Sequence, residues 1–252
     1  LIGVYVDTFQ NQLLTNLDKP LDLFSGDVDS ERTAFLVSGI VRRINMIKAI
    51  QQDDLASFDG LPDIPDEYLI SISSDISVDA SVLFNNLYRQ YVTLQPSMVE
   101  LAEEENALQA LLVKTVSSSV SNYDWLIEWA NIQDFDKVKM DDFWGGSRLL
   151  TDQPTIEAAY TLQGRTFLSE FLDELSKSSE GSTELTAVKE DFMQFYNRRY
   201  LKNWQAFAEK FDIGKNKLRG RKEWLDALET MTGKDNPYFS FMRRVSQELE
   251  PV

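Results

Sequence analysis

The chain has 252 residues, of which 43% are hydrophobic and 12% aromatic, and it carries 41 acidic against 25 basic residues, a net charge of −16. This is the composition of a folded globular protein, because disordered chains are poorer in aromatic residues. The negative charge disfavours binding to nucleic acid or anionic lipid over most of the surface. The sequence contains neither Cys nor His, which excludes disulfides, thiolate nucleophiles, imidazole bases and zinc sites of the Cys/His kind.

The beginning of the chain gives no targeting signal. It starts at Leu1, and the apolar run 1–6 has no basic flank and is too short for the hydrophobic region of a signal peptide. No stretch approaches the roughly 18 consecutive apolar residues that a membrane-spanning helix needs. We therefore interpret the chain as a piece of a longer protein, and expect any membrane anchor of that protein to lie in another segment.

Charge is distributed unevenly along the chain. Residues 1–131 hold 20 acids and 7 bases, a net of −13, whereas residues 132–252 hold 21 acids and 18 bases, a net of −3. The segment 198–222 is basic, and its candidate contact residues are Arg198, Arg199, Lys202, Lys217, Arg219, Arg221 and Lys222. Two interpretations remain open: a solvated helix end and loop, where bases are favoured, or a surface for an acidic partner, such as the first half of this chain or of another copy.

Helical periodicity dominates the first half of the sequence. Apolar residues recur at a spacing near 3.6 through 6–17, 35–47, 83–91 and 101–116. Gly60, Pro62 and Pro65 predict a loop over 53–66. Residues 68–76 alternate between apolar and polar, which favours a short strand. We expect Glu103–Glu105 to be solvated, because the three cannot share one helix face.

The second half begins with an irregular segment, 132–154, that contains Gly145 and Gly146. Four amphipathic stripes follow, over 167–175, 188–211, 224–231 and 238–249. Such stripes joined by short polar connections predict a compact bundle. We therefore predict an all-α, mainly helical fold with at most a short strand or hairpin, built of two packed, bundle-like helical lobes. The predicted parts are an acidic lobe (1–131), an irregular aromatic and glycine-rich connection (132–154) and a bundle lobe (155–252).

Candidate chemical motifs are incomplete. The run 232–235 (Thr-Gly-Lys-Asp) lacks the first glycine and the final Ser or Thr of a phosphate-binding loop, so a helix C-terminus explains Gly233 better. The carboxylates Asp134, Asp136, Asp141 and Asp142 lack the spacing and the closing Glu of a calcium loop. Paired carboxylates for glycoside hydrolysis stay open as a third interpretation, because their separation depends on the fold. The sequence predicts no catalytic residue, no metal site and no cofactor, and therefore no enzyme.

A series of short motifs carries a resemblance to a known family. Ala159-Tyr160-Thr161, followed by Gly164, resembles the Ala-Tyr-Thr-x-x-Gly segment of the TssM/IcmF family, inner-membrane components of type VI secretion systems. The other matching positions, in the family's order, are Phe143, Trp144 and Gly145 upstream, Tyr200 and Trp204 downstream, and finally Asn236 and Pro237 before a helix that ends in Val245-x-x-Glu248. The resemblance is good over about 140–252 and looser over the first 130 residues. Thr161 as a helix cap and Gly164 as a close-packing residue suffice to explain the central motif structurally.

The resemblance implies a location and partners. A TssM/IcmF-like parent would have transmembrane helices and an NTPase-like domain upstream, and this chain would belong to its periplasmic part in a Gram-negative bacterium. The family builds an envelope-spanning membrane complex with a TssL/DotU-like inner-membrane partner and a TssJ-like outer-membrane lipoprotein. The lipoprotein is expected to bind a β-rich domain, whereas this sequence shows no run of strands.

The sequence therefore favours a non-enzymatic structural segment that works through contacts with other copies of the parent and, within the complex, with its partners. It predicts neither nucleic-acid binding nor direct membrane insertion by this chain. The alternative is a cytosolic helical adaptor that binds an acidic or amphipathic partner through the segment 198–222.

Overall fold

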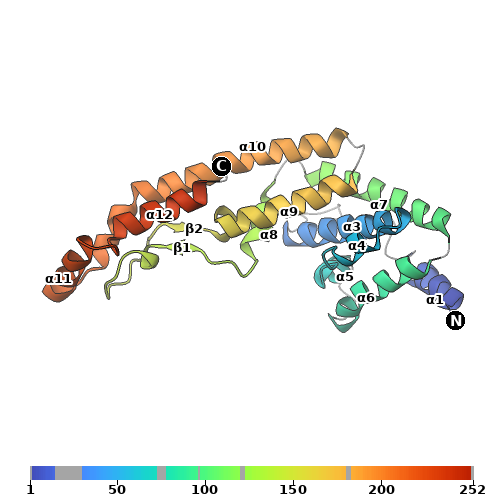
Figure 1. Cartoon of the computed structure of the whole chain (residues 1–252), viewed down its shortest axis with the longest axis horizontal. Helices are drawn as coiled ribbons and strands as arrows, with labels where there is room; N and C mark the ends of the chain where they lie inside the picture. The colour runs from blue at the N-terminus through green and yellow to red at the C-terminus, as the bar shows by residue number, and fades with distance from the viewer. Residues whose placement is uncertain are drawn as a thin grey trace. The chain divides into compact units, whose positions relative to one another are not determined.

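A computed structural model describes residues 2–14, 30–72, 78–95, 97–119, 123–179 and 183–250. Within these ranges the fold is mainly α-helical, as predicted, and the strands form one two-stranded antiparallel sheet (Figure 1). The chain divides into two compact units: residues 1–129 with 169–190, and residues 130–168 with 191–252.

The described residues of the first half of the chain are mainly helical. Its elements are α1 (Ile2–Thr8), the π-helical turn η1 (Phe9–Leu14), α3 (Ser30–Gln51), α4 (Leu55–Asp59), α5 (Glu67–Ile72), α6 (Val78–Leu94), α7 (Met98–Ser119) and α8 (Asp124–Asn131). The segment expected to be a strand, 68–76, is therefore helical as far as Ile72, and its last four residues lie outside the described part of the chain. So short an alternation cannot determine a strand when neighbouring helices bury the same apolar residues.

The second half alternates short and long elements. They are β1 (Val138–Lys139), η2 (Met140–Asp142), β2 (Thr155–Ile156), η3 (Ala158–Tyr160), α9 (Leu162–Ser178), α10 (Thr183–Glu209), η4 (Phe211–Lys217), α11 (Gly220–Met231) and α12 (Pro237–Leu249). β1 and β2 pair with Val138 opposite Ile156 and Lys139 opposite Thr155. The connection predicted to be irregular thus contains β1 and η2, and its end leads into the sheet.

The core of the first unit is built around α3. This helix is buried on nearly all sides, and it packs against α4, α5, α6 and α7. Gly39 lies where the ring of Tyr68 approaches the helix, because a Cβ atom at this position would be 2.0 Å from the ring. A helix buried all round is the expected result of an apolar surface wider than one stripe.

The core of the second unit is built around α10. Its aromatic side chains recur at intervals of three or four residues and are buried, as helical spacing predicts: Phe192, Tyr196, Tyr200, Trp204 and Phe207. α12 lies alongside this part of α10 (Figure 1), with the rings of Phe241 and Phe207 5.7 Å apart. The row of buried aromatic residues continues into η4, where the ring of Phe211 stacks on the ring of Phe241 with their centroids 4.3 Å apart.

One predicted stripe is not buried. α11 carries Trp224, Leu225 and Leu228 on one face, yet no residue of this helix is buried. The prediction that the stripe 224–231 packs inside the bundle is therefore wrong for these three side chains. Amphipathic spacing shows that a helix has an apolar face, but it does not show whether another segment of the same chain packs on that face.

The units also combine the chain differently from the predicted lobes. Residues 169–190, placed in the lobe 155–252 from the sequence, pack with the first unit. The reason is visible in side-chain contacts: Phe171 of α9 meets the ring of Trp129 edge-on at 4.7 Å. Helical periodicity is continuous through α9 and therefore carries no mark of the change in partner.

Candidate functional site

The Ala-Tyr-Thr motif forms the corner between η3 and α9. The Thr161 hydroxyl donates to the Ala158 carbonyl at 2.8 Å and accepts from the Gly164 backbone N–H at 3.3 Å. It therefore caps the first turn of α9, as expected for a threonine at a helix N-terminus. Gly164 packs directly against η3, because a Cβ atom there would lie 2.1 Å from the Ala158 carbonyl oxygen.

Two side chains of α10 bind successive carbonyls of this corner. The Tyr196 hydroxyl donates to the Ala159 carbonyl at 2.6 Å, and the Trp204 Nε1–H donates to the Tyr160 carbonyl at 2.9 Å. All four residues are buried. Buried backbone carbonyls without partners are costly, so these side chains fix where α10 passes η3.

Glu248 of α12 completes the cluster. The residue is 3% exposed, and its carboxylate accepts from the Tyr200 hydroxyl at 2.9 Å and from the Leu162 backbone N–H at the start of α9. Arg244 provides a counter-charge, with Nε 2.7 Å from the carboxylate. A carboxylate at a helix N-terminus is favoured by the exposed N–H groups and the helix dipole.

These contacts also hold the hydroxyl of Tyr200 neutral. Burial raises the pKa of Tyr200, and the negative charge of Glu248 raises it further. The phenol therefore remains a donor at neutral pH. We call the group that ties η3, α9, α10 and α12 together the η3 node, and its members are Tyr160, Thr161, Gly164, Tyr196, Tyr200, Trp204 and Glu248.

The aromatic-glycine element Phe143-Trp144-Gly145 follows η2 and has a packing role. The ring of Phe143 contacts the ring of Phe211 edge-on at 5.4 Å. Trp144 lies against Gly214, where a Cβ atom would be 2.1 Å from the indole. Gly145 has open space around it, whereas its neighbour Gly146 has φ +114° and approaches the backbone of residue 217. The glycine that the backbone requires is therefore Gly146 rather than Gly145.

Asn236 and Pro237 start α12 as predicted. The Asn236 side-chain oxygen accepts from the Tyr238 N–H at 2.9 Å, and its amide donates to the Met231 carbonyl at 2.7 Å. Pro237 occupies the first helical turn, where the missing N–H costs nothing.

The predicted contact residues are divided among three elements. Arg198, Arg199 and Lys202 are exposed on α10, and Arg219, Arg221 and Lys222 are exposed at the beginning of α11. Lys217 differs, because it is only 8% exposed and its ammonium pairs with Asp141. Its role is therefore to join η4 to η2 rather than to offer a surface charge.

The first unit contains a buried charged cluster that the sequence analysis missed. Arg43 is fully buried on α3 and donates to Glu104 of α7 at 2.9 Å and to the Tyr68 hydroxyl at 2.9 Å. Tyr88 and Tyr91 donate to the same carboxylate at 2.6 and 3.1 Å. The expectation that Glu104 is solvated is wrong, because an adjacent helix supplies its counter-charge.

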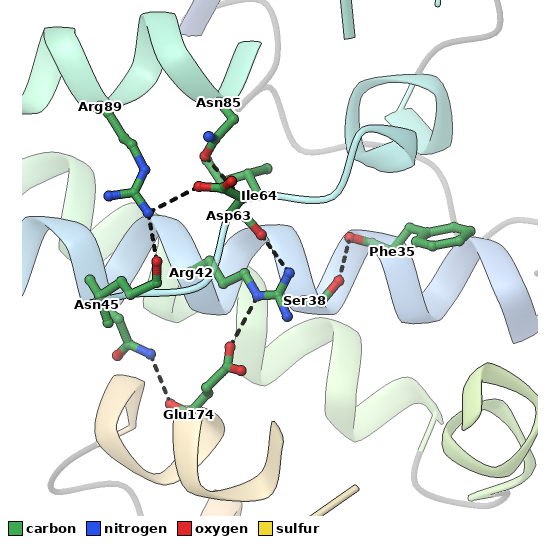
Figure 2. Close-up of polar contacts among 10 residues, drawn as sticks. Phe35, Ser38, Arg42, Asn45, Asp63, Ile64, Asn85, Arg89 and Glu174 are labelled. Carbon is green, nitrogen blue, oxygen red and sulfur yellow. Dashed lines mark hydrogen bonds and ion pairs between the residues drawn. The ribbon is translucent and has the colours of Figure 1, made fainter. Parts of the chain in front are cut away.

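Arginines also hold the loop between α4 and α5 (Figure 2). Arg42 binds the Asp63 carbonyl and donates to the Glu174 carboxylate at 3.1 Å. Arg89 lies 3.1 Å from the Asp63 carboxylate and donates to the Leu61 carbonyl at 2.6 Å. These contacts fix the loop to α3 and α6, and the Arg42 side chain also joins α3 to α9 within the first unit.

A groove of about 710 Å³ lies beside this loop. Its walls come from α3, the segment 54–62 and the part of α9 that belongs to the first unit. Most of its ionic groups are engaged: Lys48 donates to the carbonyls of residues 177 and 178, Asp173 pairs with Lys189 at 2.9 Å, and Glu174 accepts from Arg42. The Asp54 carboxylate caps α4 by accepting from Ser57, and these hydrogen bonds lower the pKa of Asp54. The groove therefore offers no pair of free carboxylates arranged for acid–base chemistry.

Two further classes of site do not occur among the residues that the structure describes. No group of three or more acidic side chains there is arranged to hold a metal ion. No helix in the same ranges combines the length and the apolar character needed to cross a membrane. The charged clusters of both units serve to join helices.

Comparison of this chain with protein-family models, with curated proteins and with solved structures gave no significant match.

Proposed function

We propose that this chain is a non-enzymatic structural segment of the periplasmic part of a TssM/IcmF-like protein, where it helps to build the envelope-spanning membrane complex of a type VI secretion system. The proposal starts from the order of motifs in the sequence. The observation that carries its structural part is the η3 node, in which Tyr160, Thr161, Gly164 and Trp204 bind backbone and buried groups. Residues used in this way serve to fix an architecture.

The exposed bases of α10 and α11 support a role in contacts. Arg198, Arg199, Lys202, Arg219, Arg221 and Lys222 leave the second unit with positive charge at its surface, while the chain as a whole carries −16. Such a distribution favours an acidic partner, such as the acidic first half of another copy of the parent. The TssL/DotU-like and TssJ-like components would be partners through the complex that the parent builds.

The test uses the gene that encodes this chain. We expect transmembrane helices to be encoded upstream, and a periplasmic reporter fused at the end of this segment to be active in the cell. The reversal of Arg219, Arg221 and Lys222 to Glu should leave the helical circular dichroism unchanged and reduce co-purification of the parent with its partners. Reversal of Lys234, an exposed base outside the segment 198–222, provides the matched control.

The outcomes separate the proposal from its alternative. An inactive periplasmic reporter, together with a gene that encodes no membrane helix, would favour the cytosolic adaptor that binds an acidic partner through the segment 198–222. Unchanged co-purification of the reversed variant would remove the role of this segment in assembly.

A further inference from the structure

α11 presents an apolar face that the described residues of this chain leave exposed. Trp224 is 42% exposed, Leu225 50% and Leu228 54%. Together with exposed Arg221 they occupy positions i, i+3, i+4 and i+7, which form one face of a helix. Every residue of α11 lies in the described part of the chain, and none of them is buried.

The short length of α11 also indicates that a second surface packs on its apolar face. The helix has 12 residues, and isolated helices shorter than about 12–15 residues are marginal in water because most helical stability comes from packing of an apolar face. Glu223 ties its beginning to Ser147 and to the Arg219 N–H. These bonds hold one end of the helix and leave the face of Trp224, Leu225 and Leu228 open.

The charges on α11 indicate which surface fits this face. Bases gather at its beginning, Arg221 and Lys222, and the acids Asp226 and Glu229 follow in later turns. Two such helices placed antiparallel would bring the bases of each beside the acids of the other, and their dipoles would oppose favourably. With a two-fold axis near Leu225, residue 221 lies opposite residue 229 of the other copy. The same surface is then used twice, as in an isologous dimer.

An anionic membrane fits the helix less well. α11 contains two bases, Arg221 and Lys222, and three acids, Glu223, Asp226 and Glu229. A helix without net positive charge gains little from an anionic surface, since membrane-surface helices are rich in Lys and Arg.

We propose that α11 pairs antiparallel with α11 of a second copy of this chain, with Trp224, Leu225 and Leu228 at the centre of the contact and Arg221 beside Glu229 of the other copy. The inference deepens the proposed function and rests on its element of self-association, although it needs no assignment to a secretion system. A 12-residue helix is about 18 Å long, so this contact buries far less than the roughly 800 Å² per partner of a standard interface. We therefore expect a weak dimer whose population depends on protein concentration.

Sedimentation equilibrium of the purified 252-residue chain tests the proposal. The native chain should show a rise in apparent mass with concentration. Leu225→Glu with Leu228→Glu should remain monomeric at every concentration while its circular dichroism is unchanged, because both side chains are exposed. Leu201→Glu, which replaces a 47% exposed leucine of α10, is the matched control and should associate like the native chain.

A charge swap tests the antiparallel geometry. Arg221→Glu alone and Glu229→Arg alone should each weaken association, because each places like charges opposite one another. The double variant Arg221→Glu with Glu229→Arg should restore it, since each new Glu then faces a new Arg. Failure of the double variant to restore association would overturn the pairing.

The absence of cysteine permits a direct probe of the axis. Leu225→Cys introduces a single thiol, and mild oxidation should yield a disulfide-linked dimer because residues near a two-fold axis lie close to their own copies. Leu201→Cys should yield little dimer under the same conditions.

A chain that is monomeric at all concentrations would overturn the inference. If that monomer binds vesicles of phosphatidylglycerol and phosphatidylcholine, and Leu225→Glu with Leu228→Glu abolishes the binding, the face is a lipid surface instead. The secretion-system assignment would fail separately, through an inactive periplasmic reporter, even if the dimer forms.

Discussion

Gly164 shows how one atom can decide a contact at the residue scale. The backbone of α9 approaches η3 at this position so closely that a methyl group would overlap the Ala158 carbonyl oxygen, at 2.1 Å. A backbone atom cannot rotate away as a flexible side chain can. The other motif glycine, Gly145, has nothing within 4 Å of the place that a methyl group would take. Two glycines of equal standing in the sequence thus have different structural roles.

Gly164→Ala should lower the free energy of unfolding by about 1–3 kcal/mol, the usual cost of overpacking. Urea unfolding followed by circular dichroism measures the change. Gly145→Ala is the control, and we expect it to stay within about 0.5 kcal/mol of the native chain because its surroundings are open. Equal effects of the two substitutions would contradict the packing at η3.

Glu248 is the other residue on which the η3 node depends. Its carboxylate receives hydrogen bonds from two elements, through Tyr200 and Leu162, although it is almost fully buried. Glu248→Gln keeps the size of the side chain but removes the charge that strengthens these bonds. We expect a loss of about 1–3 kcal/mol in the free energy of unfolding, measured by the urea midpoint.

The matched control for Glu248→Gln is Glu250→Gln. Glu250 is exposed just beyond the end of the same helix, so its substitution should change stability by less than about 0.5 kcal/mol. An equally small effect at Glu248 would show that the buried carboxylate contributes no more than a neutral amide.

At the scale of elements, α11 depends on its first turn. The pKa of Glu223 is lowered from 4.5, first by the hydrogen bond from Ser147 and then by the backbone N–H of Arg219. A carboxyl whose pKa is lower in the folded state stabilises that state above its unfolded pKa, and the contribution is lost as the pH falls through the folded value. The anchoring of α11 is therefore complete at neutral pH and disappears in acid below pH 4.5.

Glu223→Gln should consequently reduce the hydrogen-exchange protection of the α11 amides at neutral pH. The difference from the native chain should shrink as the pH falls below 4.5. Hydrogen exchange with mass spectrometry, compared at matched pH, reads the local effect without global unfolding. Asp226→Asn, on the exposed part of the same helix, is the control. A difference that grows in acid would have the wrong sign for this account.

At the same scale, the sequence predicts the burial of the aromatic face of α10, but it does not predict the exposure of the apolar face of α11. The aromatic residues of α10 occupy positions that helical spacing assigns to one face, and that face is buried. α11 has the same kind of pattern and no buried residue. Periodicity describes the surface of a helix, whereas burial also requires a second surface, which comes from elements distant in sequence or from another molecule.

The charge of −16 acts at the scale of the whole molecule. Like charges repel one another more strongly in the compact state, and salt screens this repulsion. Buried pairs such as Arg43 with Glu104, 2.9 Å apart, are screened much less. Added sodium chloride should therefore raise the urea midpoint of this chain at neutral pH.

A variant with a smaller net charge provides the control for the salt effect. Asp79→Asn with Glu103→Gln replaces two exposed acids and should make the urea midpoint less dependent on salt. A midpoint that falls as salt is added would mean that attractive surface ion pairs outweigh the net repulsion.

The sequence by itself determined the helical fold class, the start of α12 at Asn236 and Pro237 and the buried aromatic face of α10, because capping and spacing are local properties. Only the tertiary structure decided that the carboxylates of Glu104 and Glu248 are buried, that residues 68–72 are helical and that α11 is exposed. The solvation of a side chain depends on which distant segment lies against it. A carboxylate that has acidic neighbours in the sequence is therefore buried where another helix places an arginine or a hydroxyl beside it, and solvated where none does.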